Sequence, residues 1–242
     1  MRYGLIADIH SNVEALDAVL AEMKKERISE YVSLGDVVGY GANPKECIEK
    51  VKALNPSVLI AGNHEWGVLG MLELSYFNEQ AAAAIEWTEN VISGSDAEYM
   101  KTFKLSESAD DMTFVHGSLE EPKEFFYIFD ANDTDKTFRM LKTKICFVGH
   151  SHVPGIFAFD GKRPSRVKGA GAKLEDGKNY VINIGSVGQP RDGDPRASFA
   201  IYDKRAGTVE IKRVGYDIRT ARNKIIAAGL PANLASRLAE GH

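Results

Sequence analysis

Residues 3–23, YGLIADIHSNVEALDAVLAEM, contain the pattern from which the fold can be predicted. The apolar run at residues 3–7 is typical of a buried strand, and apolar residues then recur at helical spacing, at Val13, Leu16, Leu20 and Met23. The charged residues 24–27 mark the end of that helix. The same order continues in three further segments: a strand at 31–34, a helix at 44–54 and a strand at 57–61. Strict alternation predicts βαβ units and a parallel sheet in an α/β protein.

The alternation stops between residues 66 and 104, where an alanine-rich segment at 80–92 predicts a helical excursion, which can serve either as a lid or as a packing surface. Strands are expected again at 112–115 and 145–148, on either side of a helix at 134–142. Beyond Pro154 turn-forming residues separate shorter expected strands, a texture typical of antiparallel hairpins: 155–159, 180–184, 198–202 and 208–214. Helices are expected at 218–228 and 231–239. We expect residues 1–242 to form one domain that includes the excursion.

The composition, 44% hydrophobic and 26% charged residues over 242 positions, is ordinary for a globular protein and excludes disordered and fibrous classes. The net charge of −4 lacks the basic excess that a nucleic-acid scaffold or an anionic membrane would require, so neither is an expected partner. No apolar run approaches the ~20 residues of a membrane-spanning helix, and we expect a cytoplasmic protein. Cys47 and Cys146 form no CxxC pair, so neither a disulfide framework nor a zinc–thiolate site is predicted.

Five of the six histidines lie at or just beyond the end of an apolar run, together with two aspartates and an asparagine. The segments are Asp8-Ile9-His10, Gly35-Asp36, Gly62-Asn63-His64-Glu65, Val115-His116-Gly117 and Gly149-His150-Ser151-His152. Taken singly, each aspartate can be a helix cap and each histidine an ordinary polar residue. Open α/β sheets bind ligands beyond the carboxyl ends of their strands, however, so these side chains are expected to converge. Crowded imidazoles and carboxylates require a cation to hold them together, which predicts a metal site.

The ligand types suit two divalent ions. One carboxylate can bridge two cations about 3.5–4 Å apart, and Asp36 is central in chain order, which makes it the natural bridge. Imidazole and carboxylate ligands without thiolate favour Mn, Fe, Co, Ni or Zn over Ca or Mg, with Mn as the first expectation. Two such ions outweigh the charge of Asp8 and Asp36, so the site is expected to attract a phosphate ester.

The order and spacing of these motifs resemble the calcineurin-like metallophosphoesterase superfamily, in particular its small bacterial and archaeal phosphodiesterases. The resemblance extends over the whole chain and implies a four-layer α/β/β/α sandwich with helices outside two facing sheets. It also implies one metal held by Asp8, His10 and His152 and a second held by Asn63, His116 and His150, with Asp36 bridging them. His64 is implied to be a catalytic residue that contacts the phosphoryl group and protonates the leaving oxygen.

Three further residues are weaker candidates for substrate contacts. Arg191, in the segment from Asn183 to Arg191, can clamp a phosphate oxygen or can simply be solvated on a hairpin. Asn12 and Asn43 can orient ligands or substrate, although helix capping explains Asn12 nearly as well. An aromatic cluster, Phe125, Phe126, Tyr127 and Phe129, can stack on a nucleobase, but packing in a core or between subunits is the favoured interpretation.

We therefore expect a dinuclear metal-dependent phosphoesterase in which a metal-bridging hydroxide attacks the phosphorus of a phosphodiester or phosphomonoester. A dinucleoside polyphosphate hydrolase and a phosphoprotein phosphatase are alternatives within the same chemistry. A catalytically silent scaffold on the same fold is the alternative without activity, and a zinc-storage or metal-sensing protein is disfavoured by the scarcity of cysteine. The expected partner is a small phosphate ester, and homo-oligomerisation is left open.

Overall fold

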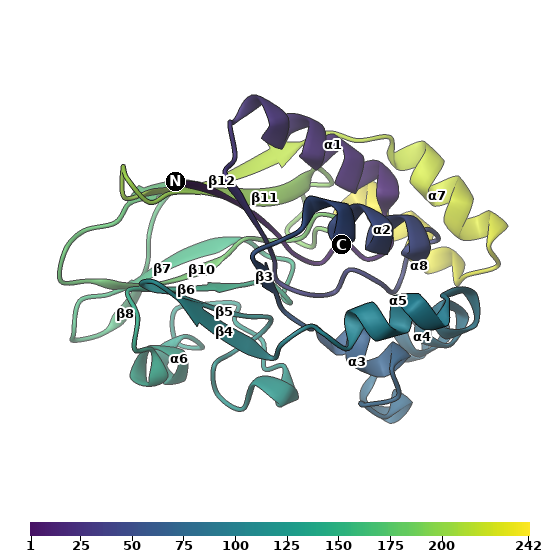
Figure 1. Ribbon diagram of the computed structural model, residues 1–242, viewed down its shortest axis with the longest axis horizontal. Helices are drawn as coiled ribbons and strands as arrows, with labels where there is room; N and C mark the ends of the chain where they lie inside the picture. Colours follow the sequence, from purple (N-terminus) through teal and green to yellow (C-terminus); the bar gives the residue numbers. More distant parts are fainter.

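Two six-stranded sheets lie at the centre of the molecule in the computed structural model, which describes residues 1–242 (Figure 1). The first sheet has the strand order β3 (Val58–Leu59), β2 (Glu30–Ser33), β1 (Arg2–Ile6), β11 (Ala197–Asp203), β12 (Thr208–Val214) and β9 (Gly171–Lys173). The second has the order β4 (Ser106–Ala109), β5 (Met112–Val115), β6 (Ile145–Val148), β10 (Asn179–Asn183), β7 (Gly155–Phe159) and β8 (Pro164–Arg166). Both sheets are mixed, since parallel and antiparallel pairs occur in each.

Helices cover the outer faces of both sheets (Figure 1). Four of them accompany the first sheet: α1 (Val13–Lys25), α2 (Pro44–Leu54), α7 (Ile218–Ala227) and α8 (Ala232–Glu240). The short helix α6 (Asp135–Met140) packs on the second sheet. A further group lies at one end of the sheets: α3 (Asn63–Val68), the 3₁₀ turn η1 (Leu74–Tyr76), α4 (Glu79–Val91) and α5 (Gly94–Met100). These layers confirm the predicted α/β/β/α sandwich.

Strand β1 shows why residues 3–7 are apolar without alternation. Its Leu5 packs in the core between the two sheets, whereas the neighbouring Ile6 packs in the core between the first sheet and α1. Successive side chains of a strand point to opposite faces, so a strand covered on both faces needs apolar residues at every position. β1 pairs in parallel with β2, and β2 with β3, as the strand and helix alternation predicts.

Some elements differ from the sequence expectation. The strand expected at 57–61 is regular only at Val58–Leu59, although Ile60 forms an isolated bridge with Lys104. β11 and β12 form the expected antiparallel hairpin, but β10 also pairs in parallel with β6, so the second half of the chain is not composed of hairpins alone. The strands β4, β8 and β9 are short, largely exposed and polar, and therefore have no apolar pattern that predicts them.

Five segments that follow strand ends meet at one rim. The ends of β1, β2, β3, β5 and β6 are each followed within a few residues by members of the five motifs.

None of the helices combines the length and the apolar character that crossing a membrane requires.

Candidate metal centre

The five motifs converge although they span residues 8 to 152. Their Asp and His side chains form two buried groups of potential ligand atoms, each group lying within 4.8 Å: Asp8, His10, Asp36 and His152 in the first, and Asp36, His116 and His150 in the second. None of these side chains is more than 5% exposed. Asp36 is the one member common to both groups, which is the position that the sequence predicts for a bridging carboxylate.

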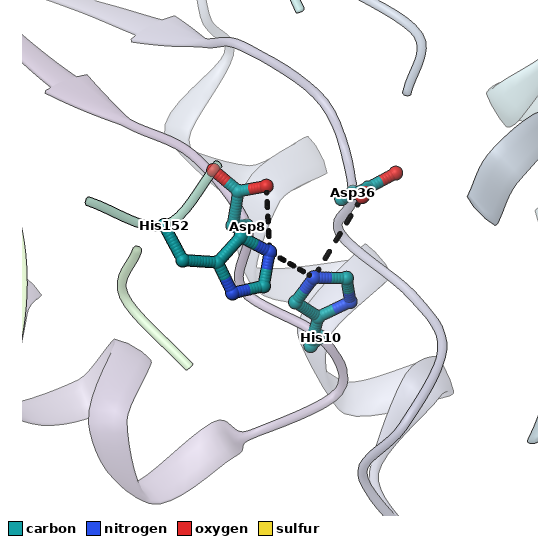
Figure 2. A group of neighbouring side chains, drawn as sticks. All are labelled: Asp8, His10, Asp36 and His152. Carbon is teal, nitrogen blue, oxygen red and sulfur yellow. Dashed lines mark hydrogen bonds and ion pairs between the residues drawn. The ribbon is translucent and has the colours of Figure 1, made fainter. Parts of the chain in front are cut away.

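The first group brings four donors from three loops face to face (Figure 2). Nε2 of His152 lies 3.2 Å from Oδ1 of Asp8 and 3.1 Å from Nε2 of His10. Nε2 of His10 also lies 3.7 Å from Oδ2 of Asp36. Two imidazole nitrogens that both present lone pairs repel each other at such a distance, and a cation between them removes the repulsion.

The second group lies on the other side of Asp36. Nε2 of His116 is 3.2 Å from Oδ2 of Asp36 and 3.8 Å from Oδ1 of Asp8, and it has no hydrogen-bond partner. Oδ1 of Asn63 is likewise buried without a partner. Buried polar atoms without partners are rare in proteins, and these two atoms fit a ligand of positive charge.

Backbone carbonyls fix the orientation of three imidazoles. Nδ1 of His10 lies 3.1 Å from the carbonyl oxygen of Val38, Nδ1 of His152 lies 2.5 Å from that of Gln189, and Nδ1 of His116 lies 2.7 Å from that of Leu34. A carbonyl oxygen can only accept, so each Nδ1 carries a proton and each Nε2 faces the interior of the site. This arrangement is common around metal-ligating histidines.

The electrostatics of the site also fit a cation. Burial disfavours protonated His116, but the negative charges of Asp36 and Asp8 outweigh burial and raise its pKa to about 10. The pKa values of His10 and His150, in contrast, are held well below the ordinary value, chiefly by burial. The two buried carboxylates thus favour a positive charge next to them. A divalent cation can take the place of the proton that they otherwise draw onto His116.

Glu65 is a positioning residue that the sequence interpretation did not single out. Its buried carboxylate accepts hydrogen bonds from the backbone N–H groups of Asp36, Val37, Val38 and Gly62, at 2.8, 2.7, 3.2 and 2.8 Å. It thereby ties the loop after β2 to the first turn of α3. Burial, followed by the charge of Asp36, raises the pKa of Glu65 to about 7. A glutamate at the third position of a helix whose N-cap is Gly62 is the signal that could have identified it.

The His64 ring is packed tightly beside the two groups. Its centroid lies 4.5 Å from that of Tyr40, 4.7 Å from that of His10 and 5.5 Å from that of Phe77. A Cβ at Gly39 would lie 2.1 Å from Nδ1 of His64, so that position requires glycine for the close approach. Nδ1 is buried without a partner, which leaves Nε2 as the atom that a ligand can reach. Burial lowers the pKa of His64 to about 4, so its imidazole is neutral at pH 7.

The three residues predicted as substrate contacts have different surroundings. Asn12 accepts from the N–H of Ala15 as the cap of α1, and its Nδ2 donates to the carbonyl of Gly188, so both ends of its amide are engaged. Nδ2 of Asn43 donates to Glu46 at an exposed position. Arg191 donates twice to the neutral Oε1 of Gln189, and its guanidinium lies 5.7 Å from the Tyr40 ring centroid. Arg191 is the only charged residue of the three, and its guanidinium forms no ion pair with a carboxylate.

The backbone of the site is strained. Five of the seven predicted metal ligands adopt positive φ angles: Asp8 at 53°, His10 at 48°, Asp36 at 52°, His150 at 66° and His152 at 59°. Such angles are uncommon for residues other than glycine and cluster at functional sites. The packing around the site therefore holds the ligand side chains at a cost in local conformational energy.

The fold and the site together define an α/β/β/α protein with a buried Asp/His cluster consistent with a dinuclear metal site. The family model of the calcineurin-like phosphoesterase superfamily domain matches residues 1–207. The chain belongs to this superfamily.

Similar proteins come from bacteria and archaea. The uncharacterized protein MJ0912 of Methanocaldococcus jannaschii is 40% identical over 239 residues, which cover 97% of this chain and 96% of that protein. The crystal structure of a metallophosphoesterase from Sphaerobacter thermophilus is 40% identical, with a TM-score of 0.89 over 100% of this chain and 99% of that one. A hypothetical protein, PH1004, from Pyrococcus horikoshii shares the fold at 22% identity, with a TM-score of 0.81 over 100% and 98% of the two chains.

Proposed function

We propose that this protein hydrolyses a small phosphate ester, with a phosphodiester as the first candidate, at a centre that holds two divalent ions. The observation that carries the proposal is the position of Asp36, whose carboxylate belongs to both buried groups of ligand atoms. Asp8, His10 and His152 would complete the first ion's site, and Asn63, His116 and His150 the second. Manganese is the first candidate, because the donors are imidazole, carboxylate and amide without thiolate.

Two such ions, when bound, lower the pKa of a water molecule and neutralise negative charge on a phosphoryl group. The protein's own contribution is to hold the ligand atoms in place before binding, through the three carbonyl contacts to Nδ1 atoms and the four hydrogen bonds to Glu65. Such preorganisation reduces the cost of assembling the site during the reaction.

His64 is the proposed acid that protonates the leaving oxygen. Its imidazole is neutral in the free protein because burial lowers its pKa to about 4. A phosphate ester brings negative charge next to the ring, and an opposite charge favours the protonated form. Binding of the substrate therefore raises the pKa of His64 in the direction that a general acid needs. Arg191, whose charge is free of a carboxylate partner, is proposed to bind a phosphoryl oxygen after exchanging its bonds to Gln189.

The test measures metal content and hydrolysis together. Protein loaded with manganese and freed of excess metal is expected to contain two ions per chain by elemental analysis. It is expected to cleave bis-p-nitrophenyl phosphate, with p-nitrophenyl phosphate, diadenosine tetraphosphate and a phosphopeptide assayed beside it. A stoichiometry of one ion or fewer, or the absence of hydrolysis with Mn, Co, Ni and Zn alike, would contradict the proposal.

A further inference from the structure

A pocket of about 270 Å³ opens directly beside the candidate metal centre. Two of its lining residues, Asn63 and His150, are predicted ligands of the second ion. Its other walls come from two separate segments: Tyr76 and Phe77 lie on the η1 side, and Phe125 and Phe126 follow the 3₁₀ turn η2 (Pro122–Glu124). The pocket therefore adjoins the place where the phosphorus atom of a substrate would lie.

The walls of the pocket are aromatic and partly open to solvent. Tyr76 is 68% exposed and Phe126 is 44% exposed, although both are large apolar rings. Large aromatic side chains that gather at an exposed concave site mark binding surfaces more often than single scattered ones. The lining contains one lysine and one carboxylate, Lys123 and Glu124, and their opposite charges cancel. The pocket thus offers aromatic surface to a neutral group.

The structure also fixes the wall formed by residues 125–127 against the metal centre. The ring of Tyr127 stacks on that of His150, with centroids 4.0 Å apart and planes within 13°. Phe125 is buried at a positive φ of 50°, and a Cβ at Gly117 would lie 2.7 Å from the carbonyl oxygen of Phe126. Since a strained backbone and a close approach at a glycine hold this segment, the wall is a defined surface next to a predicted ligand.

We propose that this pocket binds the base of a nucleoside, so that the substrate is a nucleotide ester. The proposal rests on the proposed phosphoesterase function, since the pocket adjoins that site. A volume slightly below the ~300–1,000 Å³ range of small-molecule sites suits one planar ring system with part of its sugar. Aromatic rings bind bases by stacking, whatever the base, because every base has a π face.

Binding of phosphate-free probes tests the pocket without any turnover. Adenosine, ribose and N-acetyltyrosinamide are titrated into the protein by calorimetry, with and without manganese. Adenosine is expected to bind in both states, and ribose is expected not to bind detectably. The Phe126→Ala and Tyr76→Ala variants are each expected to weaken adenosine binding about 5–150-fold, the range for loss of one stacked base contact. Both residues are exposed, so neither variant is expected to lose the fold.

Phe129→Ala is the matched control, because Phe129 is 50% exposed in the same segment but does not line the pocket. It is expected to leave adenosine binding unchanged. Phe126→Trp is expected to retain binding, because it keeps a planar face. Tighter binding of N-acetyltyrosinamide than of adenosine would overturn the proposal in favour of phosphotyrosine, and equal loss in all three alanine variants would overturn the role of the pocket. Failure of adenosine to bind a protein that holds two ions and cleaves diesters would refute only this inference. Adenosine binding by a protein that neither binds metal nor cleaves esters would refute only the proposed function.

Discussion

At the scale of single residues, Asp36 has the most demanding position in the site. Its Oδ1 accepts the N–H of His64 at 2.9 Å, while Oδ2 lies 3.2 Å from Nε2 of His116 and 3.7 Å from Nε2 of His10. A Cβ at Gly62 would lie 2.0 Å from Oδ1, so the neighbouring turn must be glycine to admit the carboxylate. The carboxylate of Asp36 is thus enclosed by His10, His116 and the first turn of α3, which includes His64.

We expect Asp36→Asn to remove both metal ions, because an amide supplies one neutral oxygen where two ions share a charged carboxylate. The metal content measured by elemental analysis is expected to fall from about two ions to fewer than one per chain, and hydrolysis is expected to become undetectable. His64→Ala serves as the comparison, since His64 is not a predicted ligand and that variant is expected to retain both ions. Retention of one tightly bound ion by Asp36→Asn would show that Asp36 does not serve both sites.

His64→Ala is expected to lower kcat about 10²–10⁴-fold for an ester with an alkoxide leaving group, the usual effect of removing a general acid. The defect is expected to shrink for p-nitrophenyl esters, because nitrophenolate departs without a proton. The two classes of ester are compared at saturating substrate and equal metal content. A defect of equal size for both would leave His64 as a phosphate contact only.

Glu65→Gln is expected to weaken metal binding about 10–100-fold, the usual effect of removing a group that positions metal ligands. The variant also is expected to unfold about 1–3 kcal/mol more easily, since an amide cannot accept the four N–H groups that the carboxylate accepts. Metal titration and chemical denaturation measure the two effects. Glu22→Gln, at a surface position that pairs only with Lys25, is the control and is expected to change neither quantity.

At the scale of elements, the strands covered on both faces were predictable and the exposed ones were not. Residues 3–7 and 145–148 are continuous apolar runs because each strand packs against a core on both of its faces. Such a run can be recognised in the sequence alone. The strands β4 and β8 pair through backbone groups at an exposed edge, and any sequence offers those groups. Propensity and periodicity therefore leave no signal for them.

The same distinction applies to the site. The Asp, Asn and His residues were predictable as candidates because their residue types are those of metal ligands and each follows a strand. The local capping position of Glu65 can be read from the sequence, but its contacts with the loop of Asp36 to Val38 could not be predicted, since that loop lies 27–29 residues earlier in the chain. The bonds of Arg191 to Gln189 could not be predicted either, because an arginine on a hairpin can equally be solvated. The positive φ angles of the ligands are imposed by tertiary packing and have no counterpart in the local sequence.

A local ion pair in the loop that follows Arg191 has a strength that depends on pH. Asp194 binds Arg196 through both carboxylate oxygens, at 3.0 and 2.6 Å, and this bonding lowers the pKa of Asp194 to about 2. Because the pKa is lower in the folded state, the contribution to stability is complete above about pH 4 and is lost as the pH falls toward 2. Both side chains are partly exposed, so the contribution is about 1 kcal/mol or less.

Asp194→Asn is accordingly expected to lower the free energy of unfolding by up to about 1 kcal/mol at pH 6, and by less at pH 3. Denaturant titrations of both proteins at the two pH values measure the difference. A difference that stays constant or grows on acidification would contradict the assignment of the lowered pKa to this pair.

At the scale of the whole molecule, the candidate metal centre draws its residues from both sheets. Asp8 and Asp36 follow strands of the first sheet, whereas His116, His150 and His152 follow strands of the second. Ions bound between them would link both halves of the sandwich, in addition to the apolar core between the sheets. Metal content is therefore expected to affect global stability as well as activity.

Removal of metal by a chelator is expected to lower Tm, and reloading with manganese at 100 times Kd is expected to restore about 2.7 kcal/mol for each independent site. For a chain of this length each kcal/mol corresponds to roughly 2–4 °C in Tm. Differential scanning calorimetry with added manganese measures the shift, and Asp36→Asn is the control that is expected to show none. An equal shift in that variant would place the stabilising ion elsewhere.

The position of β1 within the first sheet has a consequence for synthesis of the protein. β1 lies between β2 and β11, so its Arg2 to Leu5 pair with Asp203 to Ala200. A nascent chain that has left the ribosome as far as His152 contains every candidate ligand, yet one edge of β1 is still without its neighbour. Completion of the sheet must await residues 197–203, and such long-range pairing is slow to form. The surroundings of Asp8, which follows β1, are therefore expected to reach their final form only after residues 197–203 have been synthesised.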